Sequence, residues 1–185
     1  MNAIEIIGFI TAVLGIYLTA KKNIIAWPIL IVSSLAYAYF FFEIKLYADS
    51  SLQFFFVATS IFAWINWKKN LATEHTFLVK RIAPKNITGL LLLITFSGII
   101  IAKILTKFSD ATYAEYDSIL FSASIVASIL SAKMFLENWY FWIVINLSYI
   151  VLYIYKEAYL TAVLYTILIA LAVLGLREWK KQLHA

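Results

Sequence analysis

The sequence has no cysteine and few charged residues for its length. Without a cysteine among its 185 residues, disulfides, thiolate nucleophiles and cysteine-ligated metal sites are excluded. Charged residues make up 14% of the chain, whereas a soluble domain carries about 25%. Hydrophobic residues make up 64%, and the mean hydropathy is +0.89. This composition excludes a soluble catalytic domain or a nucleic-acid-binding module and indicates an integral membrane protein.

Uncharged apolar runs predict seven transmembrane helices. Each run approaches the length of about 20 residues that a helix needs to cross a bilayer. The predicted helices cover residues 4–20, 24–43, 50–67, 86–104, 117–132, 138–155 and 158–176. Ionisable residues occur only at the ends of these runs. We therefore predict an all-α membrane protein whose spans contain no charged side chain.

The basic residues predict the orientation of the chain in the membrane. With seven spans the connections alternate between the two sides, and 11 of the 15 Lys and Arg residues fall on one side. Basic residues remain in the cytoplasm, so we expect the N-terminus outside and the C-terminus inside. The residues on the predicted cytoplasmic side are Lys21, Lys22, Lys68, Lys69, Lys80, Arg81, Lys85, Lys133, Arg177, Lys180 and Lys181.

The sequence also contains an internal repeat. The segment 5–69 aligns with 117–181 without a gap, and the alignment matches Trp, Lys and Tyr residues as well as apolar ones. We predict a first three-helix repeat in 1–69, a cytoplasmic loop and linker helix in 70–116, and a second three-helix repeat in 117–185. Because a single helix separates them, the two repeats run in the same direction across the membrane. Parallel repeats of this kind place a binding site near the midplane, between the halves.

The sixth predicted helix carries a candidate site. At about 100° per residue, its aromatic residues and one amide fall on a stripe about 80° wide. The stripe consists of Trp139, Trp142, Asn146, Tyr149 and Tyr153. Aromatic rings with an amide suit a flat ligand with a polar edge, including a cationic ring. The alternative is that the Trp residues belong to an interfacial aromatic belt and that Asn146 bonds a neighbouring helix.

Further site candidates lie in both repeats. The equivalent stripe of the first repeat contains Trp27, Ser34 and Tyr37, and the next polar candidates are Gln53, Tyr165, Thr161 and Ser128. Trp67 and Trp179 stand beside Lys pairs at helix ends, so we expect them in the aromatic belt. His75 and His184 have no partner ligands nearby in the sequence, and we predict no metal, cofactor or catalytic residue.

A known family shares the most distinctive of these residues. They are the W-x-x-W-x-x-x-N motif at Trp139, Trp142 and Asn146, the preceding Glu137-Asn138, the stretch Leu160-Thr161-Ala162-Val163-Leu164-Tyr165 that leads to Gly175 and Trp179, and Trp27-Pro28 in the first repeat. With these residues the chain resembles the PnuC family of vitamin transporters. The resemblance implies a SWEET-like fold of three, one and three helices, a homotrimer, and ligand binding by Trp139, Trp142 and Asn146.

The resemblance also implies a substrate and a transport mode. It implies uptake of nicotinamide riboside through the bacterial inner membrane by facilitated diffusion, with the ligand trapped by cytoplasmic phosphorylation. Two departures keep thiamine as an alternative: Ser128 stands where many nicotinamide riboside members carry Gln, and Asn146 where many carry Asp. An ion-coupled transporter of another small aromatic metabolite ranks below both, because ion coupling needs ionisable residues within the spans.

Overall fold

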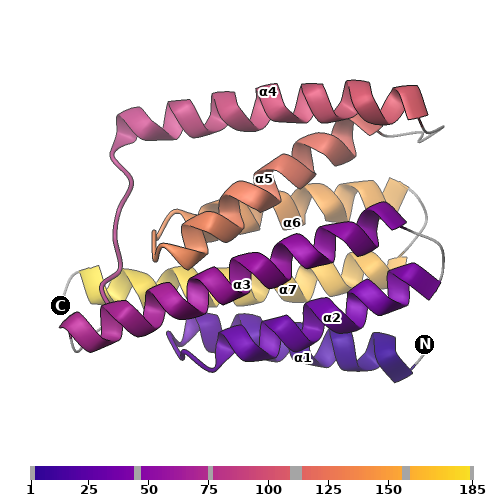
Figure 1. Cartoon of the computed structure of the whole chain (residues 1–185). Helices are drawn as coiled ribbons and strands as arrows, with labels where there is room; N and C mark the ends of the chain where they lie inside the picture. The colour runs from indigo at the N-terminus through magenta and orange to yellow at the C-terminus, as the bar shows by residue number, and fades with distance from the viewer. Residues whose placement is uncertain (1–2, 44–46, 75–76, 109–113, 156–158, 184–185) are drawn as a thin grey trace.

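The protein is seen here in a computed structural model that describes residues 3–43, 47–74, 77–108, 114–155 and 159–183. The described chain is helical, as predicted, and contains seven helices (Figure 1). They are α1 (Ala3–Ala20), α2 (Ala26–Glu43), α3 (Tyr47–Glu74), α4 (Pro84–Phe108), α5 (Ala114–Ala132), α6 (Asn138–Tyr155) and α7 (Tyr159–Leu183). The two prolines lie in the first turns of α2 and α4, where a missing backbone N–H costs no helical hydrogen bond.

Four helices contain a stretch long and apolar enough to cross a membrane. These stretches are Ala3–Ala20, Ala26–Glu43, Pro84–Ile104 and Ala162–Leu183, and α6 contains a shorter apolar stretch, Asn138–Leu152. Helix α5 is more polar because several serines lie along it, and four of them are buried within the protein: Ser118, Ser122, Ser124 and Ser131. Neighbouring helices cover the hydroxyl groups of these four serines, so the hydroxyls do not face the lipid.

Three helices continue beyond their predicted ends. Helix α3 extends past residue 67 to Glu74, α4 covers Pro84–Phe108, and α7 extends past residue 176 to Leu183. The predicted loop between residues 68 and 85 is therefore much shorter than expected. Hydropathy marks only the membrane-spanning part of a helix, whereas Lys, Leu, Ala and Gln are good helix formers that continue it into water.

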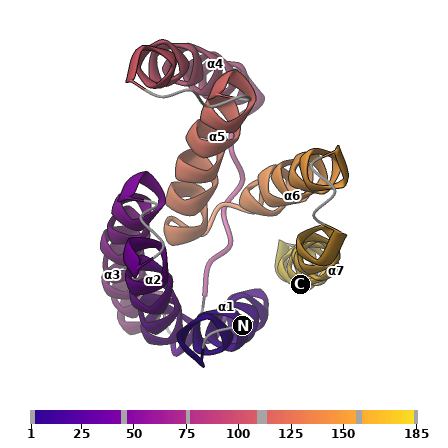
Figure 2. The ribbon, with the colours of Figure 1, turned by 90° about the vertical axis from the view of Figure 1, so that its right-hand side faces the viewer.

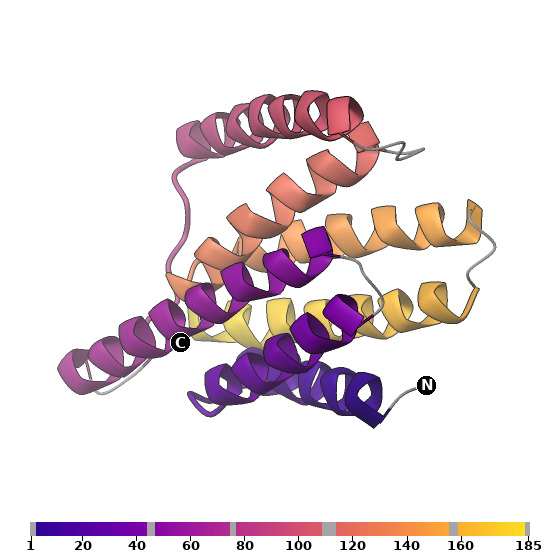
Figure 3. The same ribbon diagram turned by 45° about the vertical axis from the view of Figure 1, so that its right-hand side comes forward.

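Six helices form a closed ring, and the seventh lies outside it. Along the ring α1 contacts α2, α2 contacts α3, α3 contacts α5, α5 contacts α6, α6 contacts α7, and α7 returns to α1. Helix α4 packs only on α5 among the described helices and lies at the periphery (Figure 2). Helices α1 and α5 run in the same direction, as do α2 and α6, and α3 and α7 (Figures 1 and 3).

The turns at one end of the ring have matching geometry in the two halves. Lys22 lies two residues after the end of α1 and Met134 two residues after the end of α5, and both adopt a left-handed backbone, with φ of 57° and 64°. The two turns make the same backbone hydrogen bonds at equivalent positions of the aligned segments, such as Asn23 N–H to Leu18 O and Phe135 N–H to Leu130 O. At the first turn, Lys22 Nζ donates to the Glu178 carbonyl, and burial lowers the pKa of the Lys22 ammonium while the Glu178 charge opposes that shift.

The segment between α3 and α4 is attached to the second of these turns. The backbone of Lys80 donates to Met134 O at 2.8 Å and accepts from Leu136 N–H at 2.9 Å. The buried carboxylate of Glu137 accepts the Ile82 N–H at 3.0 Å and lies 3.4 Å from Arg81 Nε. These bonds hold the connection against the end of the ring that carries most of the basic residues.

Candidate functional site

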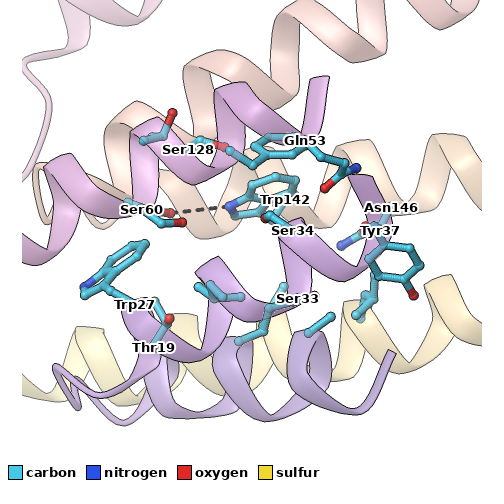
Figure 4. A pocket seen from close by; sticks show the side chains of 18 of the residues that line it. Thr19, Trp27, Ser33, Ser34, Tyr37, Gln53, Ser60, Ser128, Trp142 and Asn146 are labelled. Atoms are coloured by element: carbon cyan, nitrogen blue, oxygen red, sulfur yellow. Dashed lines mark hydrogen bonds between the residues drawn. The ribbon is translucent and has the colours of Figure 1, made fainter. Parts of the chain in front are cut away.

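A cavity of about 260 Å³ lies inside the ring of six helices. It is lined by residues of α1, α2 and α3 on one side and of α5, α6 and α7 on the other (Figure 4). Helices α2 and α6 do not contact each other in the described structure, and both contribute to its wall. The cavity therefore lies between the two segments that the sequence predicts to be repeats.

Eight of the twelve predicted site residues line this cavity. They are Trp27, Ser34, Tyr37, Gln53, Ser128, Trp139, Trp142 and Asn146. Tyr149 and Tyr165 are not among the lining residues, and their rings contact each other with centroids 4.8 Å apart. The side chains of Tyr153 and Thr161 lie outside the described residues.

Eleven lining residues are not among the predicted site residues, and five of them carry a hydroxyl group. The eleven include Thr19, Ser33, Phe56, Thr59, Ser60 and Ser131. A signal existed on α3, because Gln53, Phe56 and Ser60 are spaced three and four residues apart and so share one helix face. Serine and threonine are common at helix contacts in membranes, so their presence alone does not mark a site.

Asn146 brings an unused amide to the cavity wall. The residue is only 5% exposed, and its side chain makes no hydrogen bond to any residue that the structure describes. The alternative of a hydrogen bond to a neighbouring helix therefore finds no partner in this conformation. Gln53, on the opposite side of the cavity, likewise lines it without a hydrogen bond to the described chain. Two amides thus remain for a polar ligand.

The Trp142 ring is held by a chain of polar contacts. Its Nε1 donates to Ser131 Oγ at 3.4 Å, the Ser131 hydroxyl donates to Asn138 Oδ1 at 2.8 Å, and Asn138 Nδ2 donates to Phe135 O at 2.6 Å. These contacts tie the indole to α5 and to the turn before α6. A ring fixed in this way offers a preformed face to a flat ligand.

Most lining hydroxyls use their proton within the protein. Thr19, Ser33 and Ser128 donate to the carbonyls of Gly15, Gly8 and Ser124 at 2.8–2.9 Å. Their oxygens still have lone pairs, so toward a ligand they act as acceptors. None of the described lining residues is charged. The cavity therefore combines aromatic faces, two amides and neutral acceptors.

Four tryptophans close the cavity at the end that carries most of the basic residues. Trp67 and Trp179 are fully buried, so the expectation that they belong to an exposed aromatic belt is wrong. Their indole N–H groups donate to Ser131 O and Thr19 O, both at 3.2 Å. These bonds cross between the two halves, and both donors and acceptors occupy equivalent positions of the aligned segments. A Trp near a helix end is buried here because the other half supplies both a carbonyl and a packing surface.

The aromatic contacts continue from this pair to the cavity wall. Trp67 contacts Trp179 with ring centroids 5.8 Å apart. Trp27 meets Trp67 edge to face at 5.0 Å, and Trp139 meets Trp179 edge to face at 5.4 Å. Trp27 and Trp139 line the cavity as well, so they form its floor. Phe77, from the segment after α3, also packs on Trp67, with ring centroids 5.3 Å apart.

The described residues contain no group of three or more His, Asp or Glu side chains that could hold a metal ion. His75 and His184, for which the sequence predicts no metal or catalytic role, lie outside the described residues.

A ring of apolar helices around an uncharged, aromatic cavity defines a multi-pass membrane transporter of the small-molecule class. The sequence profile described as nicotinamide mononucleotide transporter matches residues 2–181, and the chain belongs to this family. The predicted relation to PnuC proteins is thereby confirmed.

Named relatives agree with this assignment. The chain is 27% identical over 204 residues to the nicotinamide riboside transporter PnuC of Escherichia coli (strain K12), covering 97% of this chain and 85% of that protein. The PnuC protein of Shigella flexneri matches to the same extent, with 27% identity. The solved structure titled crystal structure of the vitamin B3 transporter PnuC has a TM-score of 0.78 at 21% identity, over 96% of this chain and 80% of that one. This likeness establishes the fold.

Proposed function

We propose that the protein carries nicotinamide riboside across the bacterial inner membrane by facilitated diffusion. The observation that supports this most is the cavity, because it is enclosed by both halves of a PnuC-family fold and its lining is aromatic, polar and uncharged. Its volume of about 260 Å³ is close to the lower end of the range of about 300–1,000 Å³ that is usual for small-molecule sites.

The chemistry of nicotinamide riboside matches the groups in this cavity. Its pyridinium ring is flat and cationic, and such a ring is attracted to the faces of Trp142 and of the floor tryptophans. Its carboxamide can exchange hydrogen bonds with the free amides of Asn146 and Gln53. Its ribose hydroxyls can donate to the serine and threonine oxygens, whose own protons are already bound to backbone carbonyls.

The same lining argues against a phosphorylated substrate. The family description names a mononucleotide, whereas the two named relatives are riboside transporters. A phosphate needs Lys or Arg partners when it is buried, and the described lining residues include neither. Phosphorylation in the cytoplasm would therefore produce an anion that the cavity does not accept. In this way a kinase traps the substrate without any ion gradient.

Release into the cytoplasm requires the tryptophan floor to open. We place the end with the basic residues in the cytoplasm and the N-terminus outside, in accordance with the charge asymmetry. The two halves contact each other through α1 with α7 and through α3 with α5. Separation of these pairs at the basic end would break the bonds of Trp67 and Trp179 and expose the cavity. Closure at the opposite end would complete alternating access.

We also propose that 1–69 and 117–185 are parallel repeats and that the protein assembles as a homotrimer. The repeat proposal is supported by turns, tryptophan contacts and hydrogen bonds that recur at equivalent positions of the aligned segments. Within a trimer each protomer would have its own pathway, since one chain supplies the whole cavity wall. The assembly is tested by measuring the mass of the purified particle, by light scattering or native mass spectrometry, after the contribution of the bound detergent has been subtracted.

The substrate is tested by ligand-dependent thermal stability. A ligand that binds the folded protein raises its stability by about 2.7 kcal/mol when it is present at 100 times its Kd. We expect nicotinamide riboside to raise the melting temperature of the purified protein, and nicotinamide mononucleotide to leave it unchanged. Thiamine and riboflavin complete the panel. Stabilisation by thiamine alone would replace nicotinamide riboside as the substrate and leave the transporter assignment in place.

A further inference from the structure

Trp139 packs directly against the backbone of α7 at Gly175. A Cβ built on Gly175 would lie 2.4, 2.5 and 2.6 Å from Cζ2, Cε2 and Cη2 of the Trp139 indole. Real Cβ atoms essentially never approach another heavy atom within 3.0 Å. Any side chain at position 175 would therefore require the indole or the α7 backbone to move, because these three atoms belong to a rigid ring rather than to a flexible chain end.

The surroundings of Trp139 limit where its ring could go. On one side it meets Trp179 edge to face, with centroids 5.4 Å apart and planes at 89°. Trp179 is itself fixed, since its N–H donates to the Thr19 carbonyl and it is fully buried. Trp139 is 2% exposed and lines the cavity. The cavity is thus the space available to an indole that α7 pushes away.

The first half of the chain differs at the matching position. The alignment of 5–69 with 117–181 places Ala63 opposite Gly175 and Trp27 opposite Trp139. Ala63 is fully buried in the same apolar cluster as Trp27, and Trp27 makes the equivalent edge-to-face contact with Trp67. One half therefore has a methyl group where the other has a hydrogen. The two halves therefore differ by one methyl group at the position that Trp139 contacts in the second half.

We infer that Gly175 is a positioning residue that sets the width of the cavity floor, because its missing side chain lets the Trp139 indole recede against α7. The inference rests on the proposed function only in treating the cavity as the substrate site. Gly175 itself does not line the cavity, so its effect on a ligand would be transmitted through the Trp139 ring.

Gly175→Ala tests this directly. We expect the indole to enter the cavity and the affinity for nicotinamide riboside to fall about tenfold or more, as overpacking of a fitted site does. The decisive comparison is made in a Trp139→Phe background, because phenylalanine lacks the outer indole ring that the new methyl group meets. There Gly175→Ala should change the affinity less than about twofold relative to Trp139→Phe alone. An equal loss in both backgrounds, or a folded Gly175→Ala protein with full affinity, would overturn the inference.

Two other glycines supply matched controls. On α4, a Cβ at Gly98 would lie 2.9 Å from Ile119 Cγ1, whereas a Cβ at Gly89 would meet nothing within 4 Å. Neither residue lines the cavity. Gly98→Ala should therefore lower the melting temperature without changing the affinity, and Gly89→Ala should change neither. A loss of affinity in Gly98→Ala would mean that overpacking anywhere in the protein has this effect, which also overturns the inference.

A ligand-free measurement separates this inference from the proposed substrate. An indole displaced into the cavity should change the tryptophan emission of the purified Gly175→Ala protein, and the change should vanish when Trp139→Phe is added. That result would support the role of Gly175 even if none of the vitamins bound. If Gly175→Ala alone does not fold, the double variant should fold and bind like Trp139→Phe. Failure of the double variant to fold would contradict the inference.

Discussion

Asn138 and Asn146 are buried amides on the same helix with opposite surroundings. Asn138 is fully buried, accepts the Ser131 hydroxyl at 2.8 Å and donates to the Phe135 carbonyl. Asn146 is nearly as buried, yet it faces the cavity and makes no hydrogen bond to the described chain. Because the Asn146 amide forms no hydrogen bond with the described chain, it adds no such bond to the stability of the empty protein. A ligand that pairs with the amide gains the hydrogen bond instead.

Asn146→Leu should therefore separate binding from stability. We expect the affinity for nicotinamide riboside to fall about 5- to 150-fold, which corresponds to about 1–3 kcal/mol for an unpaired polar edge of the ligand. The melting temperature of the empty protein should stay the same or rise. Both quantities are measured on one purified sample, by calorimetric titration and by thermal unfolding.

Asn138→Leu is the matched comparison for this experiment. It removes a bonded amide and leaves the Ser131 hydroxyl without its acceptor, so the empty protein should lose about 1–3 kcal/mol of stability. If Asn146→Leu lost stability in the same way and kept its affinity, Asn146 would be a structural residue and not part of the site.

The contact of α3 with α5 and that of α7 with α1 each include one tryptophan hydrogen bond. Trp67 and Trp179 donate to carbonyls at the ends of α5 and α1, whereas the Trp27 and Trp139 N–H groups have no partner in the described structure. All four rings belong to one apolar cluster. The two kinds of tryptophan thus differ in hydrogen bonding within similar apolar packing.

Replacement by phenylalanine should distinguish the tryptophans that donate a hydrogen bond from those that do not. Trp67→Phe and Trp179→Phe each remove ring area and a hydrogen bond, whereas Trp27→Phe removes ring area alone. We expect the first two variants to be less stable than Trp27→Phe by about 0.5–1.5 kcal/mol, the usual net value of one hydrogen bond. Thermal or denaturant unfolding in detergent measures the difference. Equal losses in all three variants would show that these bonds contribute nothing to holding the two halves together.

The ends of the whole bundle differ in charge. The turns after α1 and α5, the ends of α3 and α7 and the start of α4 all lie at one end, and the start of α1 lies at the other (Figure 1). We expect reporters fused at residue 185 or inserted near residue 75 to be cytoplasmic, and reporters near residues 45 and 110 to be external. Labelling of single cysteines introduced at these positions into the cysteine-free chain checks the same point. Both termini on one side would contradict the proposed orientation.

Transport by the complete molecule should be independent of ion gradients. No charged residue is found among the described lining residues, so the cavity offers no carboxylate or imidazole to carry a proton and no anionic ligand for a sodium ion that would move together with the substrate. Uptake of nicotinamide riboside into liposomes that contain the purified protein should therefore equilibrate with the outside concentration. Accumulation above that level, abolished when a proton or sodium gradient is dissipated, would contradict facilitated diffusion.

The sequence alone predicts much of the helical architecture and part of the candidate site. Apolar runs of membrane-spanning length identify helices because the bilayer forces the backbone to satisfy its hydrogen bonds internally. The helical period placed Trp139, Trp142 and Asn146 on one face, and all three line the cavity. Helix ends were less predictable, since α3 and α7 continue into polar sequence where the bilayer no longer sets the pattern.

The depth and role of individual side chains depended on contacts between distant segments. Trp67 and Trp179 look like interfacial residues in sequence, but each is buried because the other half of the chain supplies a carbonyl and a packing partner. Tyr149 has the right spacing for the stripe, yet its ring contacts Tyr165 instead of the cavity. Local periodicity determines which face of a helix a residue occupies. What lies opposite that face depends on how the six helices close into a ring, and this brings together residues that are far apart in the sequence.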